Sequence, residues 1–119
     1  MQPVESDAPK LTVGIYNING ARYYRPMIKS FADKDTARVF AREYVRRLAP
    51  ALHSVAWRKL AQLHAATRLD TLRLPPGNRL EALKHDRAGQ HSIRINDQWR
   101  ICFVWKDGDA YHVEIADYH

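Results

Sequence analysis

Apolar residues recur along the chain with two different periods, which separate a helical first half from a strand-forming second half. Between residues 33 and 48 they recur at spacings of three and four, the pattern of an amphipathic helix. Asp33 or Asp35 can cap the start of this helix, and Pro50 ends it. A second helix follows from about Leu52, so the two are expected to form an αα-hairpin with a short loop. The apolar positions are Ala37, Phe40, Ala41, Tyr44, Val45 and Leu48 in the first helix and Leu52, Ala56, Leu60, Leu63 and Ala66 in the second.

Downstream of the turn-forming sequence "RLPPGN" (residues 73–78), the apolar period changes to two, which predicts β-strands. An Asp-Gly pair at residues 107 and 108 is the favoured sequence for a tight hairpin between the last two strands. A further short strand is expected in "MIKSF", residues 27–31. The strands expected after the turn lie at residues 79–83, 91–96 and 99–105 and in the segment "AYHVEIADYH", residues 110–119.

These elements predict an α+β fold, in which two N-terminal helices pack on one face of a mostly antiparallel sheet of about four to five strands. Alternation along the strands places Arg94 and Arg100 on the face away from the helices. Their strands are joined by the short connection at Asn96 and Asp97, so the two side chains should be neighbours. The residues expected to face the helices are Ile93, Ile95, Ile101, Phe103 and Trp105.

The first 26 residues differ in character from the rest of the chain. Prolines and glycines break this segment into short pieces, and it specifies at most one short strand, in "LTVGIYNI". We interpret residues 1–26 as a weakly ordered N-terminal extension, or as the product of a start codon assigned upstream of Met27. The folded domain is then expected to cover residues 27–119.

The charge of the 119-residue chain indicates a polyanionic partner. With 19 Lys and Arg against 13 Asp and Glu, the net charge is +6, which favours nucleic acid over an acidic protein or a membrane. The single Cys102 excludes an internal disulfide or a cysteine-based zinc site, and its apolar neighbours predict a buried thiol. No apolar run approaches a membrane span and no signal peptide is recognisable, so a cytoplasmic location is expected.

Metal and nucleotide cofactors are not expected. The six histidines form no HExxH motif, and the five glycines form neither GxGxxG nor a phosphate-binding Walker loop. The adjacent guanidinium groups of Arg94 and Arg100 suit a phosphate, which arginine binds in a forked geometry. An equally compatible interpretation is that Glu81 or Glu114 pairs with these arginines at the surface.

The last three residues, Asp117, Tyr118 and His119, all carry groups that move protons. RNA can be cut without a metal when its 2′-oxygen attacks the adjacent phosphate, a reaction that needs a base, an acid and cations around the phosphoryl oxygens. Histidine suits either proton role, because it titrates near neutral pH. Strict alternation does not bring all three side chains to the arginine face, so a bend after Ile115 is required. From the residues alone, a solvated chain end is the alternative interpretation.

The run "PPGNRLEALKHDRAGQHSIRINDQWRICFVW", residues 75–105, resembles the RelE/ParE toxin superfamily, and within it the HigB-like, plasmid-maintenance "killer" branch. The starting "MIKSF" and the final "DYH" match that branch too, so the resemblance covers residues 27–119. It implies a RelE-like fold and a type II toxin that cleaves messenger RNA in the ribosomal A site without a metal. It also implies neutralisation by a helix-turn-helix antitoxin of the HigA type.

The resemblance assigns roles to individual residues. Asp117, Tyr118 and His119 fall on the catalytic tail of the family, with His119 as general acid or base, Asp117 orienting it and Tyr118 stacking on a base or assisting proton transfer. Arg100, in "QWRICF", matches the strand arginine that contacts the scissile phosphate, and Arg94 falls near a basic residue of related toxins.

The sequence departs from the family at Glu81, where some members carry a catalytic histidine in a "KLHPLK" strand. Glu81 is therefore either a replacement base or the mark of a weaker site. A gyrase-blocking toxin of the ParE kind and a catalytically weak RNA- or antitoxin-binding module remain the competing functions. The residues expected to follow the RNA backbone are Arg79, Lys84, Arg87 and His91. The basic stripe of Arg38, Arg42 and Arg46 suits a hydrated helix face, ribosomal RNA or an antitoxin equally.

Overall fold

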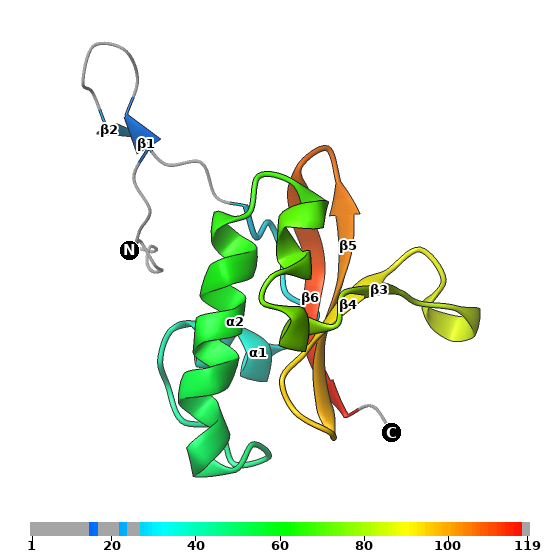
Figure 1. The fold of residues 1–119 in the computed structure, drawn as a ribbon. Coiled ribbons are helices and arrows are strands. Elements are labelled where there is room, and N and C mark those ends of the chain that lie inside the picture. Colours follow the sequence, from blue (N-terminus) through cyan, green and yellow to red (C-terminus); the bar gives the residue numbers. More distant parts are fainter. Residues whose placement is uncertain (1–14, 17–21, 24–26, 118–119) are drawn as a thin grey trace.

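The computed structural model of the protein describes residues 15–16, 22–23 and 27–117, the first two pairs as backbone (Figure 1). Within these residues lie two α-helices and a four-stranded antiparallel sheet in the order β3-β4-β5-β6. The helices are α1 (Lys34–Phe40) and α2 (His53–Ala65); the sheet strands are β3 (Glu81–Ala82), β4 (His91–Arg94), β5 (Trp99–Lys106) and β6 (Asp109–Asp117); β1 (Ile15–Tyr16) and β2 (Arg22–Tyr23) pair with each other; and the 3₁₀ turns are η2 (Pro50–Leu52), η3 (Leu69–Arg73), η4 (Pro76–Asn78) and η5 (His85–Arg87).

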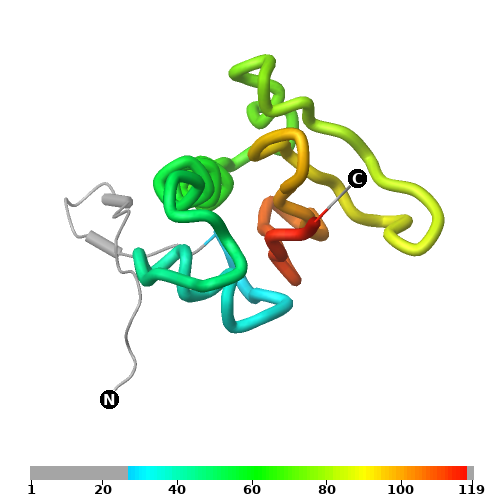
Figure 2. The backbone as a smooth tube through the Cα atoms, turned by 90° about the horizontal axis from the view of Figure 1, so that it is seen from below, coloured from blue at the N-terminus to red at the C-terminus, as the bar shows by residue number. Residues whose placement is uncertain are grey.

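The α+β fold class expected from the sequence is confirmed. Both helices cover one face of the sheet, which we call the helical face (Figure 1). Viewed from below, the sheet lies between α2 and the loop at residues 84–90 (Figure 2). We call the side toward that loop the distal face. The sheet therefore has one closed face and one face that only a loop partly shields.

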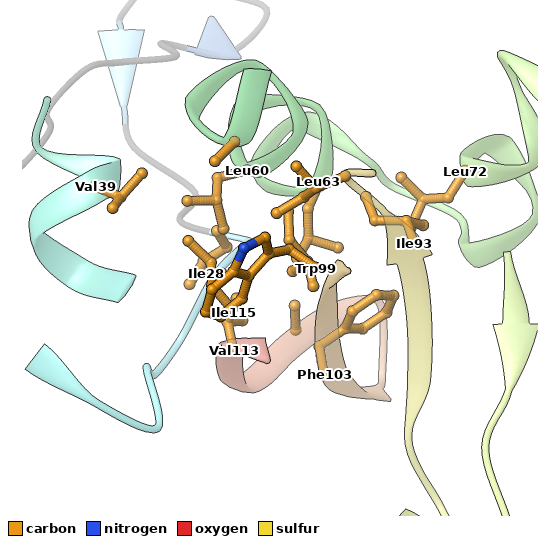
Figure 3. Close-up of a cluster of buried hydrophobic side chains, with 14 of the residues drawn as sticks. Ile28, Val39, Leu60, Leu63, Leu72, Ile93, Trp99, Phe103, Val113 and Ile115 are labelled. Carbon is orange, nitrogen blue, oxygen red and sulfur yellow. The ribbon is translucent and has the colours of Figure 1, made fainter. Parts of the chain in front are cut away.

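The core lies between the helical face and the two helices. Ile101 and Phe103 of β5 face this core, as expected, and Trp99 joins them. Leu60 and Leu63 of α2 lie in the same cluster as Trp99 and Phe103 (Figure 3). Burying each such side chain contributes roughly 1.5–3 kcal/mol, so this layer fixes the position of the sheet under the helices. The largest apolar side chains that are fully buried are Val39, Leu48, Leu60, Leu63, Leu72, Ile93, Ile101, Phe103, Val113 and Ile115.

Helix α1 is shorter than its apolar pattern predicts, and the expected extension to Leu48 is wrong. The helix ends at Phe40, and Arg42 takes a left-handed conformation with φ of 66°. The N–H groups of Arg42 and Glu43 donate to the carbonyls of Val39 (3.0 Å) and Arg38 (2.8 Å), the two bonds of a Schellman motif. Glycine usually occupies the left-handed position of this motif, and none stands here to signal the helix end.

Contacts with α2 explain why an arginine is tolerated at this position. The guanidinium of Arg42 lies 3.6 Å from the ring centroid of Trp57, and Trp57 Nε1 donates to the carbonyl of Phe40 at 3.1 Å. The indole N–H thus satisfies a free carbonyl at the end of the helix, and the indole ring stabilises the guanidinium of Arg42. Because the chain leaves the helix at Arg42, the predicted stripe of Arg38, Arg42 and Arg46 does not form. The expected short hairpin loop is instead the connection at residues 41–52.

The hairpin between β5 and β6 forms at the predicted Asp-Gly pair. Asp107 and Gly108 both have positive φ, at 54° and 82°, which is the requirement of a type I′ turn. Further along β6 the pairing register shifts opposite Cys102 and Val104, next to His112 with its φ of 53°. This irregularity resets the alternation of β6 before its last residues, which determines the face that each of them takes.

Residues 27–31, expected to form a strand, make two isolated parallel bridges to the outer edge of β6 and no regular strand. The N–H groups of Lys29 and Ala32 donate to the carbonyls of Ala110 (2.7 Å) and Val113 (2.9 Å). One edge of the sheet is thereby covered. At the other edge, the strand expected at residues 79–83 is reduced to Glu81–Ala82. Arg79 lies outside it, in a left-handed conformation with φ of 46°.

Candidate active site

Two cross-strand rows of side chains occupy the distal face. In the first, the arginine row, Arg94 of β4 lies opposite Arg100 of β5, which lies opposite Ala116 of β6. The second row is two residues further along each strand and contains Glu81, Ser92, Cys102 and Glu114, one from each of the four strands. We call it the acidic row. Two residues along a strand span roughly 6.6 Å, so the guanidinium groups and the carboxylates belong to one surface.

The side chain of Arg100 is buried and held by hydrogen bonds instead of extending into solvent. Only 8% of its surface is exposed, and its Nε donates to the hydroxyl of the fully buried Ser92 at 2.7 Å. Its Nη2 donates to the carbonyl of Arg79 at 2.6 Å. Among the described residues, none accepts a hydrogen bond from its Nη1. One edge of the guanidinium is thus held by the protein, and Nη1 keeps its donors for a ligand.

The carbonyl that holds Arg100 is itself positioned by a buried asparagine. Asn78 is fully buried, and its Nδ2 donates to the carbonyls of Leu72 (3.0 Å) and Leu74 (3.2 Å). Its Oδ1 accepts a short hydrogen bond from Lys59 of α2. This network fixes the turn that precedes Arg79 and so fixes the carbonyl acceptor of Arg100.

Arg94 is more accessible than its neighbour and has an ionic partner. Its Nη2 forms a short ion pair with Asp97, whose side chain is fully exposed. Burial lowers the pKa of Lys59, and the charges of Arg58 and Arg94 lower it further, so Lys59 lies in the field of Arg94. A phosphate at Arg94 would relieve this repulsion between cations, at the cost of competing with the exposed Asp97.

The acidic row surrounds a buried thiol. Cys102 is fully buried with Leu83 and Ala116, and burial raises its pKa. Arg87, from the loop above it, donates to Glu114 at 3.1 Å and so closes the loop onto the sheet. Glu81, at the edge strand, is exposed. Of the two carboxylates, Glu81 is the one open to solvent, and Glu114 serves as a structural partner of Arg87.

The last described residue of β6 does not share the face of the arginine row. Asp117 lies opposite the core residue Trp99, so the register places it on the helical face, and its carboxylate accepts a hydrogen bond from Gln98 at 3.1 Å. The pairing is regular from Glu114 to Asp117, so the bend expected after Ile115 is not seen within the described residues. Tyr118 and His119, the other two residues of the predicted catalytic tail, lie outside the described residues.

The four residues expected to follow the RNA backbone do not lie together. Arg79 and Lys84 are exposed beside the edge strand, and Arg87 is half-buried against Glu114. His91 pairs with Phe103 and its ring lies beside the phenyl ring, at a centroid distance of 6.3 Å, so it belongs to the helical face. The structure brings Arg94, Arg100 and Glu81 to the distal face and leaves His91 and Asp117 on the helical one.

Two residues of this surface were not singled out for it from the sequence. Ser92 holds Arg100, and Asp97 pairs with Arg94; the alternative pairing of these arginines with Glu81 or Glu114 is not observed. The alternation of β4 does predict that Ser92 lies on the same face as Arg94 and Arg100. Its direct bond to Arg100 runs diagonally between the two rows, and strand pairing alone does not reveal a diagonal contact.

Comparison with known proteins identifies the family. A family model described as "RelE-like toxin of type II toxin-antitoxin system HigB" matches residues 29–119. Toxin HigB-1 of Vibrio cholerae serotype O1 is 40% identical over 85 residues, which are 71% of this chain and 90% of that protein. The chain belongs to the HigB family of toxins. The family resemblance that the sequence carried is therefore confirmed, and membership of a type II toxin–antitoxin system implies an antitoxin partner for this HigB-family chain.

Two further similarities are more limited. Endoribonuclease HigB of Proteus vulgaris is 46% identical to this HigB-family chain over 41 residues, which are 34% of the chain and 45% of that protein. The YoeB-YefM complex from Staphylococcus aureus contains a chain that is 20% identical, with a TM-score of 0.49, covering 81% of this chain and 99% of that one.

Among the described residues, no group of three or more His, Cys, Asp or Glu side chains is arranged to hold a metal ion. Neither α1 nor α2, the helices in that part of the chain, is long and apolar enough to cross a membrane.

Proposed function

We propose that this HigB-family toxin is an endoribonuclease that cuts messenger RNA on the ribosome, with its active site on the distal face. The observation that carries the proposal is the paired Arg94 and Arg100, of which Arg100 is rigidly held with its Nη1 left for a ligand. The name of the Proteus vulgaris relative, Endoribonuclease HigB, supports the same activity. The net charge of +6 suits an RNA substrate.

The proposed reaction is a transesterification within the RNA. A base removes the proton of a 2′-hydroxyl, the 2′-oxygen forms a bond to the adjacent phosphorus, and the bond from phosphorus to the 5′-oxygen breaks. An acid gives a proton to the departing 5′-oxygen, which leaves a 2′,3′-cyclic phosphate and a 5′-hydroxyl. Charge that builds on the phosphoryl oxygens is stabilised by Arg100 and Arg94. A side chain already fixed in place needs no reorganisation as that charge develops, which suits Arg100 to this role.

The proton transfers are assigned to the end of the chain and to the edge strand. His119 is the general acid or base, Tyr118 assists it or stacks on a base of the RNA, and Asp117 orients the imidazole. Glu81 is the candidate partner, because it is the exposed carboxylate of the acidic row on the same face. Arg79 and Lys84 are proposed to contact the flanking RNA backbone from the rim of this face.

Primer extension on translating ribosomes tests the proposal. Wild-type toxin is expected to produce discrete cuts in the messenger, while His119→Ala and Arg100→Gln abolish them without loss of the folded state by circular dichroism. Arg68→Gln is the matched control, because Arg68 is an exposed arginine that pairs with Asp70 and belongs to neither row of the distal face. Full cutting by both variants would disprove the assigned site. Growth arrest without any cut would point to the gyrase-blocking alternative, which a supercoiling assay detects directly.

A further inference from the structure

A second surface of the toxin contains a groove that includes none of the residues proposed for RNA cutting. It lies between the loop at residues 41–49 and the start of α2 and has a volume of about 290 Å³. Figures 1 and 2 both show this loop on the helical side of the molecule, with the sheet between it and residues 84–90. A ligand in this groove therefore leaves the arginine row uncovered.

The walls of the groove are held rigidly by α2. The ring of Tyr44 stacks on that of His53, at a centroid distance of 4.8 Å and an interplanar angle of 17°. His53 Nε2 accepts a hydrogen bond from the N–H of Val45 at 3.0 Å, and its Nδ1 donates to the carbonyl of Ala49 at 3.1 Å. On the opposite wall Arg42 lies over Trp57. A surface that is already ordered loses little conformational entropy on binding.

The residue types of the groove are those that dominate protein interfaces. Tyrosine, tryptophan and arginine supply most of the binding energy in such interfaces, and Tyr44, Trp57 and Arg42 line this one. Tyr44 is 61% exposed, one of the two large apolar side chains that the described part of the chain leaves at the surface; the other is Leu74. The left-handed Arg42 adds a strained backbone position at the same place.

The positively charged arginines near the groove favour an acidic binding partner. Arg42, Arg46 and Arg58 are exposed, and none of them has a carboxylate partner among the described residues. The lining contains a single acidic residue, Glu43. Arg42 lines the groove, Arg46 belongs to the loop that borders it, and Arg58 follows the lining residue Trp57 in the sequence. These cations complement a segment that presents carboxylates beside an apolar side chain.

A peptide fits this groove better than a nucleic acid does. One face of the Trp57 ring is covered by Arg42 and one face of the Tyr44 ring by His53, so each ring leaves at most one face on which a base could stack. Glu43 lies in the lining, where it would repel a phosphate and accept a hydrogen bond from a peptide N–H. The remaining lining residues are the apolar Val39 and Pro50 and the hydroxyl-bearing Ser54.

We propose that this groove binds an acidic segment of the antitoxin, with an apolar side chain of that segment inserted between Tyr44 and Trp57. The proposal rests on membership of the toxin–antitoxin family and is independent of the proposed nuclease activity. It predicts that neutralisation and RNA cutting depend on different residues.

Isothermal titration calorimetry of the full-length toxin with its purified cognate antitoxin tests this proposal. We expect Tyr44→Ala and Arg42→Gly each to raise the dissociation constant of the complex at least tenfold. Arg42→Gly retains the left-handed backbone conformation, which glycine adopts freely. Leu74→Ala, at the other exposed apolar side chain, is the matched control and should bind like the wild type. In growing cells, Tyr44→Ala toxin should arrest growth in spite of the antitoxin.

The same variants distinguish the competing occupants. Cutting of messenger RNA on the ribosome should be unchanged in Tyr44→Ala and Arg42→Gly. The proposal is overturned if both variants bind the antitoxin within twofold of the wild type, or if they lose ribosome binding while keeping full antitoxin affinity, which would make the groove an RNA contact. Because calorimetry needs no cleavage, a failure of the nuclease proposal leaves this test intact.

Discussion

Arg94 and Arg100 lie directly opposite each other on β4 and β5, but the protein holds them in different ways. Arg100 is fixed by Ser92 and by the carbonyl of Arg79, whereas Arg94 forms an ion pair with the exposed Asp97. A buried, hydrogen-bonded cation stabilises developing charge more strongly than a solvated one, because less solvent screens it. The two arginines are therefore expected to contribute unequally to catalysis.

The first prediction compares the two arginines by substitution. Arg100→Gln should reduce the single-turnover rate of messenger cutting by about 10²–10³-fold, the loss typical of one preorganised donor. Arg94→Gln should cost roughly tenfold or less, because its side chain is half-exposed and already shares its charge with Asp97. Rates are measured on programmed ribosomes at saturating toxin. Equal losses in the two variants would contradict the difference in burial.

The second prediction concerns Ser92, the buried hydroxyl that positions Arg100. Ser92→Ala leaves the Nε of Arg100 without its acceptor and should slow cutting by up to about 100-fold, since small displacements of a catalytic group are costly. Ser92→Thr keeps the hydroxyl and should restore most of the rate. A purely structural role would instead lower the melting temperature of Ser92→Ala in proportion to its loss of activity, with no recovery in the threonine variant.

The third prediction tests the asparagine under the turn. Asn78→Ala removes the donor to the carbonyls of Leu72 and Leu74 and the acceptor of Lys59 in a fully buried place. Leaving buried polar groups unpaired costs about 1–3 kcal/mol each, so the free energy of unfolding in urea should fall by about that much or more. Thr67→Ala, at an exposed loop position, is the control and should change stability by less than about 0.5 kcal/mol.

The chemistry of Cys102 gives the fourth prediction. Burial raises the pKa of this thiol, and the residue has no exposed surface. A thiol reagent such as dithionitrobenzoate should therefore label the native toxin at the rate at which the sheet opens, and label the urea-unfolded chain immediately. Rapid labelling of the native protein would show that the loop at residues 84–90 leaves the distal face uncovered.

The sequence determined the sheet more closely than it determined the helices. Period-two alternation and the Asp107-Gly108 turn are local signals, and they placed Arg94 beside Arg100 in the observed register. The end of α1 depends instead on Trp57, which is distant in sequence and allows Arg42 to take a conformation that glycine normally takes. No local pattern encodes that contact, so the helix was predicted to continue to Leu48.

In the candidate site, too, some features follow from the local sequence pattern and others depend on distant contacts. Which residues share the distal face followed from alternation, but the tether of Arg100 depends on a carbonyl in the turn at Arg79, whose position is fixed by Asn78. Backbone groups carry no sequence signal of their own. His91 was assigned to the RNA backbone from its charge class alone, and its pairing with Phe103 shows that it faces the core.

The fifth prediction concerns the pH dependence of stability, through His64. Its Nδ1 accepts a hydrogen bond from the N–H of Ile28 at 3.3 Å, and its ring contacts Phe40, with a centroid distance of 5.2 Å. Burial lowers the pKa of His64 below its ordinary value of 6.5, so the folded protein favours the neutral ring. Protonation would place a charge in a partly buried site beside Phe40 and remove the acceptor that holds the N–H of Ile28.

The sign of the effect follows from proton binding by the two states. Below pH 6.5 the unfolded chain binds a proton at His64 more readily than the folded one, so the free energy of unfolding should fall on acidification and level off only below the folded-state pKa. His64→Gln cannot titrate and should remove this component, which appears as the difference between the urea-unfolding curves of wild type and variant from pH 7.5 to about pH 5. Parallel pH curves for the two proteins would show that His64 does not couple folding to protonation.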